Sequence, residues 1–205
     1  MMKFYNNPPR NQWLELTQRP SQQNENLEPI VDNILNEVKR NGDQALIELT
    51  KKLDKANLDN LKVSSTELEE AENKVPKKLK SAIATAASNI ETFHRSQIQK
   101  EDTIETTPGV FCWRESRAIE KVGLYIPGGS APLFSTVLML GIPAQLAGCK
   151  EIVLCTPPNE NGEINPAILY TAKLLGIKNI FKVGGAQAIA GMAFGTETIP
   201  RVYKI

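Results

Sequence analysis

Residues 122–140, VGLYIPGGSAPLFSTVLML, constrain the fold of this chain more than any other stretch. The apolar run from Val122 to Ile126 is typical of a buried strand, and it ends at the Pro-Gly-Gly turn 127–129. A helical apolar pattern then starts at Phe134. A strand joined to a helix through a pair of glycines is the arrangement by which α/β proteins bring backbone N–H groups to an anionic or dinucleotide ligand.

This pattern recurs near the other end of the chain. The apolar run 180–183 is followed by Gly184-Gly185-Ala186-Gln187 and a second helical run. From Lys121 onward strand and helix signals alternate, which predicts a parallel sheet with right-handed crossovers and a small-molecule site at the carboxyl ends of its strands. We expect strands at 122–126, 151–155, 180–183 and, as the start of a fourth, 201–205, with helices at 134–147, 166–175 and 186–194.

Helix signals dominate the residues before 121. We expect an N-terminal arm at 1–26, and at 27–120 the mostly helical part of a first, incomplete α/β domain. Gly42 ends one helix in that part, because glycine readily adopts left-handed conformations, and Asp43 can cap the next helix.

Further local signals follow in this helical part. Ser64 and Glu67 are spaced as in a capping box. Pro76 suits the first turn of a longer helix, whose inward face includes Phe93. The runs 110–113 and 117–119 are typical of short strands that can pair as a hairpin.

Tyr125 and Gln187 are the candidate ligand-binding side chains at the two glycine turns. Tyr125 can stack on or hydrogen-bond to a nucleotide, but a core tyrosine with a satisfied hydroxyl explains it equally well. Gln187 offers a donor and an acceptor to the same cleft, or it satisfies the end of its helix. The glycines also suit any strand that turns sharply into a helix, and the turn lacks the third glycine of the GxGxxG fingerprint. Three nearby hydroxyls can cap helices or bind an anion, with capping the expected role, namely those of Ser130, Ser135 and Thr136.

Residues able to carry out catalysis or to bind zinc are few. The chain has one histidine, His94, and three cysteines, Cys112, Cys149 and Cys155. A catalytic zinc site needs about three converging His, Cys or carboxylate ligands. We therefore assign no catalytic residue and no metal ligand to this chain. Packing is the expected role of Cys149 and Cys155, and the unpaired cysteines indicate a reducing, cytoplasmic compartment.

Composition argues against two classes of partner. A formal net charge of +1 at pH 7 gives no electrostatic reason to expect nucleic acid or an anionic membrane. The first residues lack the apolar segment of a signal peptide, and the longest apolar stretch, near 133–140, is too short to span a bilayer. We expect a small-molecule ligand, no nucleic-acid partner and no membrane contact.

Long segments of the chain resemble the histidinol dehydrogenase family. The similar segments are VGLYIPGGSAPLFSTVLML at 122–140, AGCKEIVLCTPP at 147–158, VGGAQAIAGMAFGTETIP at 183–200, VDNILNEVKRNGDQALIELTKKLDK at 31–55 and NIETFHRSQ at 89–97. The resemblance covers nearly the whole chain, with the loop 159–165 as the main departure. It implies that the chain corresponds to the N-terminal half of the enzyme.

The resemblance implies an activity, two cofactors and an assembly. The family oxidises L-histidinol to L-histidine through the aldehyde, in two NAD-dependent steps of histidine biosynthesis, with zinc holding the substrate. It forms an intertwined homodimer. Its central domains are Rossmann-like and similar to those of aldehyde dehydrogenases, so we expect 121–205 to be such a domain, incomplete at its C-terminal end. The family's NAD-contacting tyrosine and glutamine correspond to Tyr125 and Gln187.

The resemblance also implies that the catalytic Glu-His pair, the zinc ligands and a third NAD contact, an asparagine, lie beyond Ile205. The chain by itself is therefore expected to be inactive. The alternative is a short, non-catalytic nucleotide-binding or assembly module that keeps the cleft without the chemistry. A reading frame that continues into an FGPGN-like segment indicates the dehydrogenase, whereas a stop codon after Ile205 indicates the module.

Overall fold

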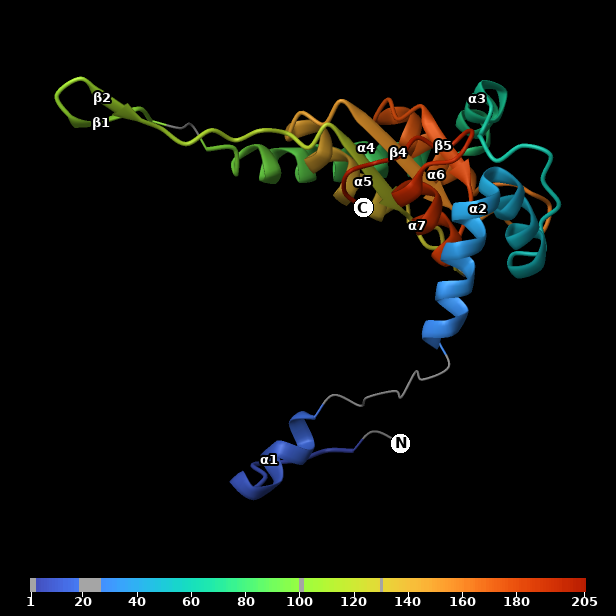
Figure 1. The fold of residues 1–205 in the computed structure, drawn as a ribbon, viewed down its shortest axis with the longest axis horizontal. Coiled ribbons are helices and arrows are strands. Elements are labelled where there is room, and N and C mark those ends of the chain that lie inside the picture. The colour runs from blue at the N-terminus through green and yellow to red at the C-terminus, as the bar shows by residue number, and fades with distance from the viewer. Residues whose placement is uncertain (1–2, 19–26, 100–101, 130) are drawn as a thin grey trace.

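The structure is a computed structural model that describes residues 3–18, 27–99, 102–129 and 131–205. A three-stranded parallel sheet lies at the centre of the main body, with helices on both of its faces (Figure 1). The helices are α1 (Arg10–Thr17), α2 (Leu27–Leu53), α3 (Ser65–Lys74), α4 (Lys77–Arg95), α5 (Phe134–Leu146), α6 (Pro166–Leu174) and α7 (Gly185–Phe194). The strands are β1 (Ile104–Thr107), β2 (Val110–Cys112), β3 (Lys121–Tyr125), β4 (Glu151–Thr156) and β5 (Asn179–Lys182).

The central sheet is parallel and has the order β3-β4-β5, as the alternation of strand and helix signals predicts. Single bridges extend both edges, with Lys204 parallel to β3 and Lys62 antiparallel to β5. The expectation of a strand start at 201–205 is corrected to one bridge, because only Tyr203 and Lys204 pair with β3. The carbonyl of Lys204 accepts from the N–H of Gly123 at 2.8 Å.

The alternation of side chains along the strands assigns each helix to one face of the sheet. Cys155 and Phe181 point to one face, where they share a core with residues of α2 and α7. Their sequence neighbours Leu154 and Ile180 point to the other face, where they pack with α3, α5 and α6. α4 forms an outer layer against α5 and buries Ile83 there. The sequence therefore folds into an α/β sandwich with a Rossmann-like strand order.

Gly42 divides α2 into two helical halves, as expected, because its φ of 52° and ψ of −131° are not helical. The cap that the sequence indicates at Asp43 is corrected. The Asp43 carboxylate accepts from the Thr196 hydroxyl, while the N–H of Asp43 donates to the carboxylate of Glu197. A side chain that follows α7 thus caps the second half of α2. The capping box of Ser64 and its N3 glutamate is confirmed.

Two expectations for the segment before the sheet are wrong. β2 pairs with β1 around a turn at Gly109, and residues 117–119 are not in a strand. The turn at Gly109 pairs β2 with β1, which precedes it, rather than with residues 117–119, which follow it. Phe93 is 63% exposed, because the contact of α4 with α5 ends at Ile90.

Two parts of the chain stand apart from the main body in Figure 1. One is the hairpin of β1 and β2, and the other is α1, none of whose residues is buried. Residues 19–26 of the expected arm 1–26, and Ser130, lie outside the described residues. α2 packs on α7 and α3 on α6, so helices of the segment 27–120 cover the sheet of 121–205. The division into these segments stays a prediction.

Candidate cofactor-binding site

The chain reverses its direction across the sheet at β3, and this marks the carboxyl end of β3 as a place for a ligand. From β3 to β5 the chain moves in one direction, with α5 and α6 on one face. α7 then packs on the opposite face, and the chain returns to the outer edge of β3 at Lys204. Open α/β sheets bind ligands outside the carboxyl ends of strands at such a switch point. Tyr125, the last residue of β3, lies there.

The structure joins Tyr125 to the second glycine turn. Its hydroxyl accepts a hydrogen bond from the backbone N–H of Gly185 at 3.0 Å. Gly185 is the first residue of α7 and has a φ of 58°, a conformation that favours glycine. The hydroxyl of Tyr125 therefore has the partner that a structural role requires. The same bond holds the ring beside a helix N-terminus, where the exposed N–H groups suit an anionic ligand.

Gln187 lies in the first turn of α7 and is 1% exposed. Its Oε1 has no hydrogen-bond partner among the described residues. It does not act as a cap, because the N-cap of α7 is Gly184 and no side chain caps this helix. An unpaired buried amide oxygen costs about 1–3 kcal/mol. The structure therefore leaves Gln187 with an acceptor that is suited to a donor group of a ligand.

Packing explains one glycine in each turn. Pro157, directly after β4, lies between the two turns. A Cβ on Gly128 would lie 2.6 Å from the Cγ of Pro157, and a Cβ on Gly184 would lie 2.6 Å from its Cβ. Gly129 has open space around it and stays accessible to a ligand. Sequence reasoning missed Pro157, although its place directly after a buried strand was an available signal.

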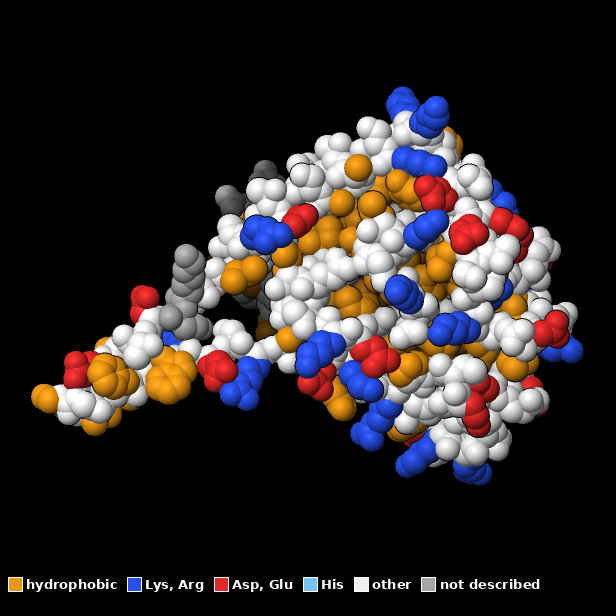
Figure 2. Space-filling model, turned by 90° about the horizontal axis from the view of Figure 1, so that it is seen from above, with side chains coloured by type: hydrophobic (Ala, Val, Ile, Leu, Met, Phe, Trp, Pro, Cys, Tyr) orange, Lys and Arg blue, Asp and Glu red, His pale blue; other side chains and the backbone are white. Residues whose placement is uncertain are grey.

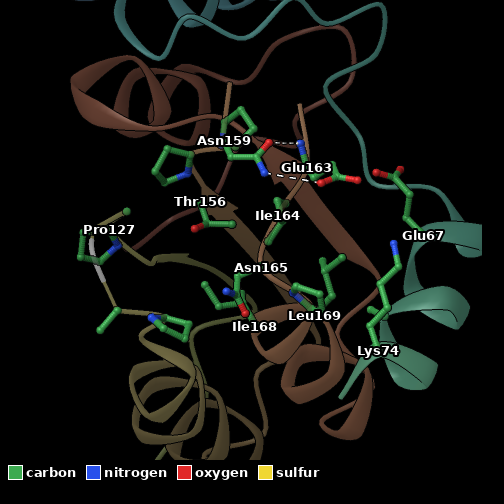
Figure 3. A pocket seen from close by; sticks show the side chains of 18 of the residues that line it. Glu67, Lys74, Pro127, Thr156, Asn159, Glu163, Ile164, Asn165, Ile168 and Leu169 are labelled. Carbon is green, nitrogen blue, oxygen red and sulfur yellow. Dashed lines mark hydrogen bonds between the residues drawn. The ribbon is translucent and has the colours of Figure 1, made fainter. Parts of the chain in front are cut away.

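A cavity of about 390 Å³ opens at the carboxyl ends of β3 and β4 (Figure 3). Its walls come from the turn after β3, the loop after β4, α3 and the start of α6. In that loop the side-chain oxygen of Asn159 accepts from the N–H groups of Asn161 and Glu163. Neither Tyr125 nor Gln187 lines this cavity. Tyr125 packs on the face of the sheet that α2 and α7 cover, and Gln187 belongs to α7 itself, whereas the cavity lies on the side of α3 and α6.

Carboxylates outnumber amines around this cavity, whose charged lining residues are Glu67, Glu70, Glu163 and Lys74. Glu67 forms an ion pair with Lys182 at 2.6 Å. Burial alone would raise the pKa of Glu67, but hydrogen bonds from Lys182 and Ser64, together with the charge of Lys182, lower it. The negative charge of Glu67 is thus paired with Lys182 of β5. Lys74 is the one basic residue among the described residues that line the cavity, so there is no cluster of positive charge to bind phosphates.

The remaining candidate residues do not form a reactive cluster. Cys155 packs in the core, as expected, and burial raises the pKa of its thiol to about 12. His94 lies near the end of α4, where its Nδ1 is 2.8 Å from Oε1 of Gln97. Within the described part of the chain, no three His, Cys, Asp or Glu side chains come together as metal ligands would.

The helix caps expected near the first glycine turn are not formed at α5. Ser135 and Thr136 do not cap α5, which starts after Leu133 without a side-chain cap. Their hydroxyls follow the N-cap position instead of occupying it.

No helix in the described ranges combines the length and the apolar character that crossing a membrane requires.

In comparisons with known sequences, the family model and the curated relatives that match this chain all belong to one dehydrogenase family. Residues 17–205 match the family model described as histidinol dehydrogenase. The histidinol dehydrogenase of Bacteroides fragilis strain YCH46 is 58% identical over 204 residues, which are 100% of this chain and 48% of that protein. That of Escherichia coli strain K12 is 50% identical over 192 residues, or 93% of this chain and 43% of that protein. The chain spans about half the length of the curated relatives it matches.

Comparison with solved structures agrees. A crystal structure of histidinol dehydrogenase from Elizabethkingia anophelis matches with a TM-score of 0.92 and 61% sequence identity, over 97% of this chain and 46% of that one. The arrangement of α/β elements is therefore shared with that structure.

Proposed function

The chain belongs to the histidinol dehydrogenase family, and we propose that it is the N-terminal part of an NAD-dependent oxidoreductase of histidine biosynthesis. The whole enzyme oxidises L-histidinol to L-histidine through the aldehyde. This chain contributes the Rossmann-like half-domain that binds the nucleotide. The observation that carries the cofactor assignment is that the hydroxyl of Tyr125, from the end of β3, lies at the glycine turn before α7, which Gln187 follows with an unpaired buried oxygen.

The residues at that turn fit a nicotinamide dinucleotide. Gln187 keeps a buried amide oxygen without a donor, and the cofactor has both amide and hydroxyl donors to offer. The hydroxyl of Tyr125 accepts from the N–H of Gly185, which holds this aromatic residue at the switch point. When bound, NAD would supply the acceptor for hydride. The protein residues of this chain would bind and orient it.

Zinc is proposed for the whole enzyme but not for the residues described here, which do not fit it. A zinc site needs about three or four converging His, Cys or carboxylate ligands. No such set comes together in the ranges that the structure describes. We therefore propose that the zinc ligands and the catalytic acid–base pair belong to the half of the relatives' length that this chain does not match.

We propose a homodimer as the working assembly, in the cytoplasm, without nucleic-acid or membrane partners. The hairpin of β1 and β2 extends from the body with apolar side chains exposed along it (Figure 2). Phe111 is 56% exposed and Trp113 is 63% exposed. Large exposed apolar side chains on a projecting element are typical of a surface that another subunit covers.

The test compares this chain with the complete product of its gene. The complete protein is expected to reduce NAD when L-histidinol is added, and to lose this activity when zinc is chelated. The 205-residue chain alone is expected to produce no NADH and to hold no stoichiometric zinc. A gene that ends after Ile205, with a product that binds NAD without turnover, would instead support the non-catalytic module.

A further inference from the structure

Gly185, the first residue of α7, lies against both of the predicted cofactor-binding side chains. Its backbone N–H donates to the hydroxyl of Tyr125 at 3.0 Å. A Cβ built on Gly185 would lie 2.6 Å from Oε1 of Gln187. One backbone position therefore touches a side chain from the end of β3 and a side chain from the first turn of α7.

The amide group of Gln187 occupies the space that a side chain on Gly185 would need. The same Cβ would lie 3.3 Å from Cδ and 3.4 Å from Nε2 of Gln187. Cβ atoms in proteins essentially never come within 3.0 Å of a non-bonded heavy atom. Any side chain at this position would have to displace the amide, so the observed place of Gln187 requires glycine.

Gln187 has little room to give way. It is 1% exposed and is among the largest side chains that are fully buried in the protein. Protein interiors are packed as densely as organic crystals, so a displaced buried amide has to push on its neighbours. An exposed glutamine could change its rotamer instead. The contact with Gly185 is therefore a real constraint on where this amide lies.

The backbone of Gly185 adds a second constraint. Its φ of 58° lies in the left-handed region, which residues with a Cβ rarely adopt. A shift toward the usual negative φ would rotate the N–H that Tyr125 accepts relative to the helix that carries Gln187. Both contacts therefore depend on glycine at this position.

Two other glycines show that Gly185 has a role of its own. A Cβ on the preceding Gly184 would meet Pro157, so packing between the two turns explains that residue. Gly176, which follows α6, has a φ of 65° and open space around it, so the end of a helix explains it. Gly185 differs from both, because a polar side-chain group fills the space at its Cα.

The unpaired oxygen of Gln187 indicates that this arrangement serves more than the fold. Oε1 has no hydrogen-bond partner among the described residues. A buried acceptor without a donor lowers stability, and native structures rarely keep one without a functional reason or a missing partner. Gly185 thus holds Gln187 in a position that is unfavourable until a donor arrives.

We propose that Gly185 is a positioning residue of the nucleotide site, which fixes the hydroxyl of Tyr125 through its N–H and the amide of Gln187 through its missing side chain. This rests on the proposed function, because it takes NAD to bind at those two residues. Gly185 acts through them and is assigned no contact with the cofactor itself. A substitution at this one position therefore disturbs two binding side chains.

The test is a pair of double-mutant cycles in the complete protein. Gly185→Ala is combined with Gln187→Ala in one cycle and with Tyr125→Phe in the other, because residues that act together show non-additive effects. Gly176→Ala is the matched control, since it places a Cβ at a left-handed φ without a neighbouring atom. The dissociation constant for NAD, the KM for NAD, the KM for L-histidinol and the Tm of the cofactor-free protein are measured for each variant.

We expect Gly185→Ala to raise the dissociation constant and the KM for NAD about tenfold or more, because it disturbs two contacts. The KM for L-histidinol should stay within about twofold. Gly176→Ala should change NAD affinity by less than about twofold, although both glycine variants lower the Tm through backbone strain.

The cycles should show coupling at both residues. The factor by which Gly185→Ala raises the dissociation constant should be at least about threefold smaller when the amide of Gln187 is already absent, and likewise when the hydroxyl of Tyr125 is absent. The Tm lost on Gly185→Ala should also be smaller in the Gln187→Ala background, because the overlapping group is gone.

Equal factors in both backgrounds overturn the inference, as does a Gly185→Ala protein that binds NAD as tightly as Gly176→Ala. If Gly185→Ala does not fold, recovery of folding by Gln187→Ala supports the steric contact, and failure of the double variant overturns it. The single variants Gln187→Ala and Tyr125→Phe test the proposed function separately. If they weaken NAD binding without coupling to Gly185, the site stands and the inference fails. If neither has any effect, the proposed site itself is wrong.

Discussion

The backbone N–H of Asp43 donates to the carboxylate of Glu197 at 2.7 Å and so joins residues 154 positions apart. The bond lies at the break in α2, where Gly42 leaves the N-terminus of the second half without a local cap. An anionic side chain at a helix N-terminus is favoured by the unpaired N–H groups and by the helix dipole. The end of α7 and the middle of α2 are thereby fixed together, which sets the register between these two helices.

Gly42→Ala should destabilise the protein by about 1–3 kcal/mol from backbone strain alone, because φ of 52° and ψ of −131° are sparsely populated by other residues. A Cβ there would also overlap the carboxylate of Glu197. Gly176→Ala is the control, since Gly176 has a φ of 65° and a Cβ on it would meet nothing within 4 Å. Denaturant unfolding should show the larger loss for Gly42→Ala. Equal losses would mean that Glu197 simply moves aside.

Glu197→Gln should lower the Tm at neutral pH and make stability less sensitive to acid. Hydrogen bonds from the N–H of Asp43 and from its own N–H lower the pKa of Glu197. The stability from this carboxylate is therefore present above its ordinary pKa and is lost as the pH falls through the lowered, native-state pKa. Thermal unfolding of both proteins from pH 7 to pH 3 measures this. Parallel curves would show that the carboxylate adds nothing as a charge.

Tyr125→Phe isolates the hydroxyl that Gly185 binds. Loss of one such hydrogen bond should cost about 0.5–1.5 kcal/mol of stability, and NAD affinity in the complete enzyme should fall about tenfold or less. Tyr125→Ala and Gln187→Ala should weaken NAD binding by a similar factor per residue. Isothermal titration with NAD is the measurement. Unchanged affinity in both alanine variants would place the cofactor in another cleft.

The sequence predicted the parts of the structure that depend on local pattern. The parallel order of strands, the break at Gly42 and the capping box of Ser64 follow from hydrophobic period and residue chemistry within a few positions. The cap from Glu197 to Asp43 could not be predicted, because it depends on how α7 returns across the sheet.

The candidate site shows the same division. Tyr125 and Gln187 follow from their places at two glycine turns, together with the family resemblance. The unpaired Oε1 of Gln187 is a property of helix packing, which its sequence position in the first turn of α7 does not reveal. The contacts of Pro157 with both glycine turns likewise depend on the tertiary fold, which places the two turns on either side of its ring.

Cys155 should resist alkylation in the native protein, whereas the exposed Cys112 should react first. Burial raises the pKa of the Cys155 thiol to about 12, so almost no reactive thiolate is present at pH 8. The native state then holds this proton more tightly than the unfolded chain, and stability should fall as the pH rises above the thiol's ordinary pKa. Mass spectrometry of iodoacetamide-treated protein tests reactivity, and Cys155→Ala should remove its share of the alkaline loss. Rapid native labelling at Cys155 would show that β4 opens readily.

Serine substitutions at Phe111 and Trp113 should weaken the proposed dimer of the complete enzyme. Both side chains are more than half exposed on the hairpin that extends from the body, so replacing them costs little in the isolated subunit. In an interface each buried aromatic is worth about 1–4 kcal/mol, which would raise the dimer dissociation constant at least about fivefold. Phe93→Ser is the control, because Phe93 is equally exposed at 63% but lies on α4. Sedimentation velocity over a concentration range gives the dissociation constant. A dimer that the hairpin variants leave intact, but that Phe93→Ser dissociates, would move the proposed interface from the hairpin to the outer helix layer.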